Sequence, residues 1–178
     1  MSKPVKAAVL SAGSWGTAFG VVLADAGCEV TLWARRPEVA EAVNSTRTNP
    51  DYLPGVELPQ GIRATTDPAE AAAGADFTIL TIPSQTLRAN LAEWTPLLAP
   101  DTVLVSLMKG VELGSAMRMS EVIEDVAKVG ADRIAVVTGP NLAREIAARM
   151  PAAAVVACTD EAVAQRLQAV CHTPYFRP

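Results

Sequence analysis

The regular alternation of short apolar runs with helical patterns constrains the fold of this chain more than any other feature. Apolar runs that are expected as strands lie at residues 6–10, 29–34, 62–66, 75–83, 102–107 and 133–138. A helical pattern or a helix-start signal follows each of them. This alternation is typical of repeated βαβ units, which build a parallel sheet between two layers of helices. The expected fold class is therefore α/β, with a doubly wound, mostly parallel sheet flanked by helices.

Composition agrees with a sheet that is buried on both faces. Half of the 178 residues are hydrophobic but only 4% are aromatic, so Ala, Val, Leu and Ile must build the core. Nineteen acidic and fifteen basic side chains give a net charge of −4 without a basic block, which argues against a nucleic-acid partner. No apolar run reaches the roughly 18–20 residues that a membrane span needs.

The cysteines and the N-terminus indicate where such a chain works. The three cysteines are odd in number and widely spaced, so they predict neither a disulfide framework nor a metal site. A single histidine, His172, excludes a site with several histidine ligands. The first residues run straight into a strand pattern and do not resemble a signal peptide. A reducing, cytoplasmic location is expected.

Helix signals fill the intervals between the strands. Gly27 suits the end of a first helix, Asp67 and Pro68 suit the start of a short one, and Ser84 is expected to cap another. Pro-rich residues 49–59 are expected as an ordered surface loop. The remaining helices are expected over 14–26, from Pro37, over 115–129, from Asn141 to Met150 and over 161–170, with a further strand over 152–159.

The turn after the first strand carries a glycine pattern. Gly13 and Gly16 occupy the second and third positions of a G-x-G-x-x-G sequence, where they would admit a pyrophosphate and close helix packing. The helix N-terminus would supply free N–H groups to the phosphates. Ser11 stands at the first position, where a tight turn usually has glycine. The turn favours a Rossmann-type, dinucleotide-binding fold; the alternative is a turn with two glycines and no ligand.

Two arginines follow the second strand. An Asp or Glu at this place would bind the hydroxyls of the adenosine ribose, whereas Arg35 and Arg36 suit a 2′-phosphate and stacking on adenine. The plain alternative is a solvated helix start, but two cations beside a helix N-terminus are mildly unfavourable. The pair therefore favours NADP(H), with NAD(H) as the alternative cofactor.

Two later strand ends carry candidate substrate residues. Lys109 follows the strand at 102–107 and precedes Gly110, so it can project into the ligand crevice and hold a phosphate or polarise a carbonyl. Asn141 follows Gly139 and Pro140 at another strand-to-helix junction. The alternatives are a solvated surface lysine and an asparagine that only caps a helix.

Four motifs in this order resemble the N-terminal half of bacterial NAD(P)-dependent glycerol-3-phosphate dehydrogenase, across essentially the whole chain. They are Ala12-Gly13-Ser14-Trp15-Gly16-Thr17-Ala18, Pro83-Ser84, Lys109-Gly110-Val111-Glu112 and Gly139-Pro140-Asn141-Leu142-Ala143-Arg144-Glu145. The resemblance implies reduction of dihydroxyacetone phosphate by NAD(P)H to sn-glycerol 3-phosphate, a precursor of phospholipids.

The resemblance also implies roles for single residues. Ser14 and Trp15 match contacts to the pyrophosphate of the cofactor. Further matches to cofactor contacts are Arg35 and Arg36 at the adenosine phosphate end, Tyr52 and Ala143. Lys109 matches a lysine shared by cofactor and substrate, and Gly139 and Asn141 match substrate positions.

Two departures from the family pattern shape the expectation. Glycine is usual where this chain has Ser11, which predicts a strained turn or an altered cofactor affinity. The family's helical C-terminal domain, with the lysine that acts as general acid/base, is absent. Residues 1–178 are thus expected to form the NAD(P)-binding domain, with no catalytic residue of their own. Without positioned acid/base help, which is worth about 10²–10⁴-fold in rate, the chain should bind cofactor and turn over poorly.

Two other functions remain open from the sequence. One is a non-catalytic dinucleotide-binding or sensor module. The other is a related dehydrogenase for a hydroxy acid or ketopantoate, against which Lys109-Gly110 and Gly139-Pro140-Asn141 argue. Apolar surface left without the second domain would favour self-association into a homo-oligomer.

Overall fold

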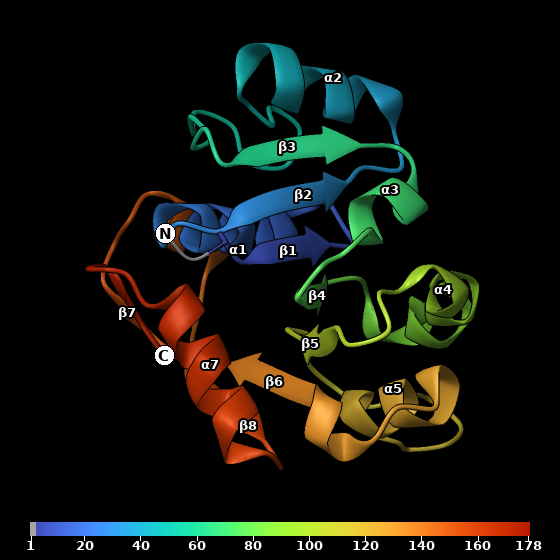
Figure 1. The fold of residues 1–178 in the computed structure, drawn as a ribbon. Helices are drawn as coiled ribbons and strands as arrows, with labels where there is room; N and C mark the ends of the chain where they lie inside the picture. Colours follow the sequence, from blue (N-terminus) through green and yellow to red (C-terminus); the bar gives the residue numbers. More distant parts are fainter. Residues whose placement is uncertain (1–2) are drawn as a thin grey trace.

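A seven-stranded sheet forms the centre of the protein, in a computed structural model that describes residues 3–178. The strand order is β3-β2-β1-β4-β5-β6-β8, and every neighbouring pair is parallel except β6 and β8. The strands are β1 (Lys6–Val9), β2 (Glu29–Trp33), β3 (Ile62–Thr65), β4 (Phe77–Leu80), β5 (Val103–Ser106), β6 (Ile134–Thr138) and β8 (Val155–Cys158). The expected doubly wound, mostly parallel α/β sheet is confirmed (Figure 1).

The chain reverses its direction of travel across the sheet between β1 and β4. It adds β2 and β3 on one side of β1, and then returns to place β4 on the other side. At such a switch point the connections after the two central strands diverge and leave a crevice beyond their carboxyl ends. The residues after β1 and β4 are therefore the first place to look for a ligand.

Helices cover both faces of the sheet. Figure 1 shows α3, α4 and α5 along one side and α7 on the other, where α7 also contacts α1. The helices are α1 (Ser14–Asp25), α2 (Pro37–Thr46), α3 (Pro68–Ala72), α4 (Leu87–Trp94), α5 (Met119–Ala127), α6 (Ala143–Ala147) and α7 (Glu161–Cys171). Among residues 3–178, no helix combines the length and apolar character that crossing a membrane requires.

Alternate side chains of the central strands β4 and β5 enter different cores. Phe77 and Ile79 of β4 pack in the cluster that contains Phe19 of α1, whereas Leu80 packs with Leu91 of α4. All five side chains are fully buried. The two-sided burial explains why these strands read as continuous apolar runs.

Several local signals act as the sequence predicts. Asp67 accepts a hydrogen bond from the Ala69 N–H at the start of α3. Gly27 has a φ of 96° directly after the C-cap of α1, a conformation that glycine adopts without a Cβ clash. Loop 49–59 is ordered, and its buried Leu53 and Leu58 anchor it more deeply than a surface loop.

Several of the expected helix boundaries are wrong. The helix expected from Ser115 begins only at Met119, because the preceding residues bond to α4 and to one another. The helix expected to run through Met150 ends at Ala147. Ser84 does not cap a helix with its side chain; it begins the short 3₁₀ turn Ser84–Thr86 that precedes α4.

The strand expected over 152–159 is split. β7 (Ala152–Ala153) leaves the main sheet and pairs with β9 (Phe176–Arg177), and only β8 joins β6. Phe176 then packs edge-on against Phe19, with 6.0 Å between the ring centroids. This ring contact packs β9 against α1.

Candidate functional site

Two adjoining cavities lie beyond the carboxyl ends of the central strands, and both include Thr81, Ile82 and Pro83 in their walls. The arginine cavity, of about 540 Å³, is otherwise lined by Ser11, Ala12, Gly13, Ser14, Trp33, Ala34, Arg35, Arg36, Val39, Tyr52, Thr86 and Asn90. The lysine cavity, of about 410 Å³, is otherwise lined by Trp15, Ser84, Leu107, Met108, Lys109, Val137, Thr138, Gly139, Asn141, Leu142 and Ala143. The shared wall makes them two parts of one crevice at the switch point.

The glycine turn brings the N-terminus of α1 close to the sheet. A Cβ on Gly16 would overlap the carbonyl oxygen of Ser11 and lie 2.7 Å from the Thr81 hydroxyl, so the turn requires glycine there. The first turn of α1 contains no acidic residue, and its N-cap Gly13 provides no side-chain cap. Free N–H groups and the positive end of the helix dipole therefore face the arginine cavity, an arrangement that suits phosphate.

The Ser11 side chain forms a hydrogen bond with one of the N–H groups of this turn. Its Oγ accepts a hydrogen bond of 3.1 Å from the Gly13 N–H. Within residues 3–178 the non-glycine residues with positive φ are Arg47, Ala116, Lys128 and Arg149, so the backbone of Ser11 does not have the strain that the sequence suggests. The serine acts on the turn through its hydroxyl.

The Pro-rich loop 49–59 is bound directly to this turn. The fully buried Asn49 donates hydrogen bonds of 2.9 Å to the Ala12 carbonyl and to the Thr17 hydroxyl. The Ser14 hydroxyl in turn donates to the Tyr52 carbonyl over 2.7 Å. These contacts place the Tyr52 ring at the rim of the arginine cavity.

The two arginines have different surroundings. Arg36 pairs with Asp51 and with Glu38, and its guanidinium lies 5.4 Å from the centroid of the Tyr52 ring. The hydrogen bond that Arg36 donates to the Asp51 carboxylate is the main cause of the raised pKa of Arg36. Arg35 is exposed and forms no ion pair within the described part of the chain. Arg35 is thus the guanidinium more readily available to an anion.

Lys109 reaches across the lysine cavity. Its Nζ donates a hydrogen bond of 3.2 Å to the carbonyl oxygen of Gly139, which joins the connections after β5 and β6. A Cβ on Gly139 would lie 2.8 Å from the Ala153 carbonyl, so this position also requires glycine. The lysine keeps further N–H donors for a ligand.

Two buried polar side chains in the crevice have unused hydrogen-bonding capacity. Neither the Nδ2 nor the Oδ1 of Asn141 has a partner among residues 3–178, and the same is true of the Thr81 hydroxyl. Asn141 does not cap α6, whose N-cap is Leu142, so the capping interpretation is wrong. A buried polar group without a partner costs about 1–3 kcal/mol, which a hydrogen-bonding ligand would recover.

The structure gathers the candidate residues from distant parts of the sequence. Gly13, Ser14, Arg35, Arg36 and Tyr52 line the arginine cavity, and Trp15, Lys109, Gly139, Asn141 and Ala143 line the lysine cavity. Gly16 lines neither and acts through packing. Trp15 lies apart from Ser14, in the lysine cavity, where its ring is 5.9 Å from that of Phe19.

Sequence reasoning missed Thr81, Asn49 and Asp51. Thr81 directly follows β4, and a polar residue at the end of a buried strand is a signal that could have identified it. Asn49 and Asp51 carry no such local signal, because their roles depend on contacts with residues at least fifteen positions away.

Comparisons with known proteins agree with this geometry. Residues 6–164 match the family model described as NAD-dependent glycerol-3-phosphate dehydrogenase N-terminus. The chain is 87% identical over 178 residues to glycerol-3-phosphate dehydrogenase [NAD(P)+] of Streptomyces avermitilis and 85% identical to that of Streptomyces coelicolor. In both cases the match covers 100% of this chain and 53% of the relative, so the chain spans about half the length of these curated relatives.

Solved structures give the same result. The crystal structure of glycerol-3-phosphate dehydrogenase from Coxiella burnetii has a TM-score of 0.89 and 29% identity, over 98% of this chain and 53% of that one. The Saccharomyces cerevisiae enzyme has a TM-score of 0.86 and 25% identity, over 98% of this chain and 56% of that one. On the family match, these relatives and the crevice, the chain belongs to the NAD-dependent glycerol-3-phosphate dehydrogenase family, of which it matches the N-terminal part.

Proposed function

We propose that residues 1–178 form the NAD(P)-binding domain of an enzyme that reduces dihydroxyacetone phosphate to sn-glycerol 3-phosphate for phospholipid synthesis. The observation that carries this proposal is the placement of Lys109 and the unpartnered Asn141 in a cavity that adjoins the glycine turn and its arginines. A phosphate-bearing substrate and a dinucleotide would then meet at the shared wall.

The arginine cavity suits the adenosine half of the dinucleotide. Gly13 and Ser14 lie where the α1 N–H groups would donate to a pyrophosphate, and Arg36 and Tyr52 line the space for the adenosine. The unpartnered Thr81 hydroxyl, at the wall between the cavities, would bond to the middle of the molecule. When bound, the nicotinamide supplies the hydride.

NADP(H) is the favoured cofactor in this proposal, and NAD(H) is the alternative. Arg35 and Arg36 follow β2, where a carboxylate would suit the ribose hydroxyls of NAD(H). Arg36 is held by Asp51, so the exposed Arg35 is the stronger candidate for a 2′-phosphate.

The lysine cavity suits the substrate and the nicotinamide end. The Lys109 ammonium would hold the substrate phosphate or polarise its carbonyl, while Asn141 would donate and accept hydrogen bonds. Gly139 has no side chain, so substrate would come close to its backbone in this cavity. Trp15 and Ala143 would form the wall of the cavity towards the cofactor. We assign the proton donor to the part of the relatives that this chain does not span.

A titration of the chain with NADPH and NADH tests the cofactor half of the proposal. Trp15 and Trp33 line the two cavities, so bound dihydronicotinamide should quench tryptophan emission. We expect saturable quenching by both dinucleotides, with tighter binding of NADPH. Gly16→Ala should abolish it by closing the turn, whereas Gly20→Ala, whose Cβ would meet the terminal Leu32 Cδ2 at 3.1 Å, should retain it. Absence of quenching in the folded wild-type chain would refute the proposal.

A substrate panel separates this activity from that of other dehydrogenases with the same fold. A ketopantoate reductase from Ralstonia eutropha matches the fold with a TM-score of 0.68 and 22% identity. For the panel, the chain is fused to the residues that follow the matched region in the Streptomyces avermitilis relative; we call this protein the fusion. We expect oxidation of NADPH with dihydroxyacetone phosphate and none with ketopantoate. Cofactor binding without activity on any substrate would favour a sensor module.

We also propose a cytoplasmic location and self-association of the isolated chain. Cys28, Cys158 and Cys171 are free, which suits a reducing compartment. Leu142 and Val155 are each 61% exposed, and such apolar side chains favour association with a second copy. Light scattering at increasing concentration tests the association; a strictly monomeric chain would contradict it.

A further inference from the structure

The segment that carries Lys109 has no helix or strand of its own. It runs from the end of β5 at Ser106 to the start of α5 at Met119. Gly110 has a φ of 99° and Ala116 a φ of 58°, the second of which is unfavourable for a residue with a Cβ. A segment of this kind keeps one conformation only when further contacts fix its backbone.

Gln85 provides one such contact from the connection between β4 and α4. Its Nε2 donates to the Val111 carbonyl over 2.8 Å, and its Oε1 accepts from the Leu113 N–H over 2.9 Å. One side-chain amide thus bonds to the backbone on both sides of Glu112, as a neighbouring strand would. The two bonds lie two and four residues beyond Lys109.

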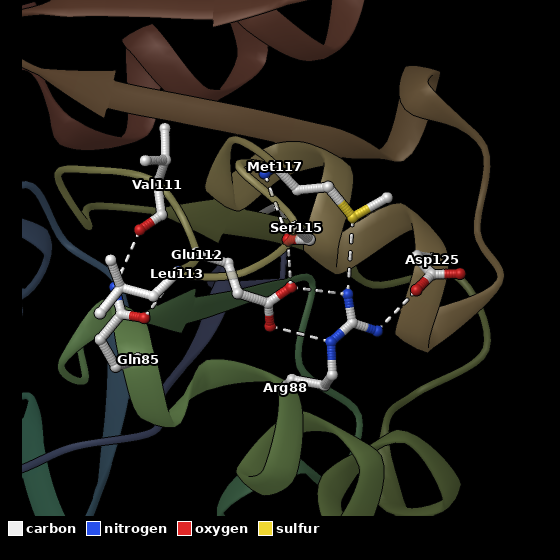
Figure 2. Close-up of polar contacts among 8 residues, drawn as sticks. All are labelled: Gln85, Arg88, Val111, Glu112, Leu113, Ser115, Met117 and Asp125. Carbon is white, nitrogen blue, oxygen red and sulfur yellow. Dashed lines mark hydrogen bonds and ion pairs between the residues drawn. The ribbon is translucent and has the colours of Figure 1, made fainter.

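Arg88 of α4 provides the second contact (Figure 2). Its Nε and Nη2 donate to the two carboxylate oxygens of Glu112 over 2.9 and 3.0 Å, and its Nη1 donates to Asp125 of α5 over 2.6 Å. The planar guanidinium therefore joins α4, the Lys109 segment and α5 with fixed geometry.

Glu112 is held from several sides. Its side chain is only 16% exposed, and the Ser115 hydroxyl donates to its Oε2 over 2.6 Å. Its backbone N–H donates to the Met117 carbonyl, and its carbonyl accepts from the Ala116 N–H. Hydrogen bonds from Arg88 and Ser115 lower the pKa of Glu112, so its carboxylate stays charged at neutral pH.

We propose that Arg88 and Gln85 are positioning residues that hold the Lys109 segment in the conformation in which the lysine faces substrate in the lysine cavity. This inference rests on the proposed function for the role of Lys109, but the contacts that it uses involve side chains outside the lining of both cavities. Gln85 and Arg88 are not among the residues that line the two cavities, so we expect them to act on the ligand only through the Lys109 segment. Without them Lys109 should still be present but disordered relative to Gly139.

The chain contains a matched ion pair that serves as a control. Arg63 of β3 pairs with Glu70 of α3, and the Thr65 hydroxyl donates to the same carboxylate over 2.5 Å. This trio repeats the Arg, Glu and hydroxyl pattern of Arg88, Glu112 and Ser115, yet it lies against neither cavity of the crevice. Arg63→Ala therefore removes a comparable surface interaction without touching the Lys109 segment.

A double-mutant cycle in the fusion tests the inference. The variants are Arg88→Ala, Lys109→Ala, the double variant, Arg88→Lys and Arg63→Ala, each measured for kcat and for the KM of both substrates. Losing a charge-assisted hydrogen-bond network is expected to raise the KM for dihydroxyacetone phosphate roughly tenfold in Arg88→Ala. In the Lys109→Ala background the same change should add less than about twofold, because its effect passes through the lysine.

The other variants separate positioning from general stability. Arg88→Lys keeps the charge but cannot bond to Glu112 and Asp125 as a planar fork, so its KM should lie between those of wild type and Arg88→Ala. Arg63→Ala should behave as wild type, and in every Arg88 variant the KM for NADPH should change less than the KM for dihydroxyacetone phosphate. An equal effect of Arg88→Ala with and without Lys109, or an equal effect of Arg63→Ala, would overturn the inference.

Amide hydrogen exchange measured on the 178-residue chain tests the positioning role without an activity assay. In Arg88→Ala and in Gln85→Ala, amides of residues 109–113 should exchange faster, with α1 and the glycine turn unchanged. No acceleration in that segment would overturn the positioning role whether or not the fusion is active. Faster exchange combined with a fusion inactive on dihydroxyacetone phosphate would retain the structural role and refute the proposed function instead.

Discussion

The ammonium of Lys109 donates a hydrogen bond to the carbonyl oxygen of Gly139 over 3.2 Å, so residues thirty positions apart close one side of the crevice. The bond joins the connections that follow β5 and β6, neighbouring strands whose carboxyl ends lie at the same edge of the sheet. It leaves the ammonium with donors for a phosphate. The parallel sheet thus brings together the two motifs that the sequence separates.

Replacing Lys109 should weaken binding of the phosphate substrate. In the fusion, Lys109→Ala is expected to raise the KM for dihydroxyacetone phosphate by roughly 10- to 100-fold, the value of a hydrogen bond to a charged group. Lys6→Ala is the matched control, because Lys6 begins β1 at the opposite end of the sheet. Steady-state kinetics check this; equal KM values for the two variants would contradict the assignment.

Replacing Asn141 should separate stability from ligand binding. Its two polar side-chain atoms have no partner among residues 3–178, so Asn141→Ala should leave the free energy of unfolding unchanged or raise it, and should weaken substrate binding. Asn44 is the contrast, since its Nδ2 donates to the Ala64 carbonyl over 2.9 Å and its Oδ1 accepts from the Ala64 N–H over 2.8 Å.

Asn44→Ala should therefore lower the free energy of unfolding by about 1–3 kcal/mol and leave substrate binding as it was. Urea denaturation of the chain and the KM of the fusion give the two readings. A loss of stability in Asn141→Ala as large as that in Asn44→Ala would contradict the assignment of Asn141 to ligand binding.

Removing the Ser11 hydroxyl should tighten cofactor binding. The hydroxyl accepts a bond from the Gly13 N–H, and without it this N–H is free for the pyrophosphate. The net contribution of one hydrogen bond between this N–H and the pyrophosphate corresponds to an affinity gain of about 2- to 10-fold. We expect this gain for both Ser11→Gly and Ser11→Ala. Fluorescence titration with NADPH measures it. The alanine variant controls for the added freedom of glycine, and weaker binding in both variants would refute the idea.

The two arginines should contribute unequally to cofactor preference. Arg36 is already paired with Asp51, whereas Arg35 is exposed and forms no ion pair within the described residues. Arg35→Ala should lower the affinity for NADPH by roughly tenfold and that for NADH by less than about twofold. Arg36→Ala should lower both affinities, because it also loses its contact with the Tyr52 ring. Equal losses for NADPH and NADH in Arg35→Ala would contradict a role at a 2′-phosphate.

Sequence patterns predict the elements that are determined by interactions between residues close in the sequence. The runs that became β4 and β5 are buried on both faces, and Asp67 starts α3 through its own side chain, so residues close in sequence carried those signals. The glycine turn was predictable for the same reason. Gly16 meets Ser11, five positions earlier in the chain.

Features that depend on distant contacts were not predictable. The segment before Met119 is not helical because Glu112 bonds to Arg88, twenty-four positions earlier. β7 leaves the main sheet because Ala152 pairs with Phe176 near the end of the chain. No local pattern indicates either partner, and the same holds for Asn49 at the glycine turn.

The rate of dihydroxyacetone phosphate-dependent oxidation of NADPH, compared between the chain and the fusion, tests the central proposal most directly. The proposal places cofactor and substrate residues in this chain and the proton donor outside it. The fusion should therefore be active, and the 178-residue chain, with cofactor bound, should be slower by about 10²–10⁴-fold or inactive. A chain that matches the fusion in rate, or a well-folded fusion that binds NADPH and leaves dihydroxyacetone phosphate unreduced, would contradict the proposal.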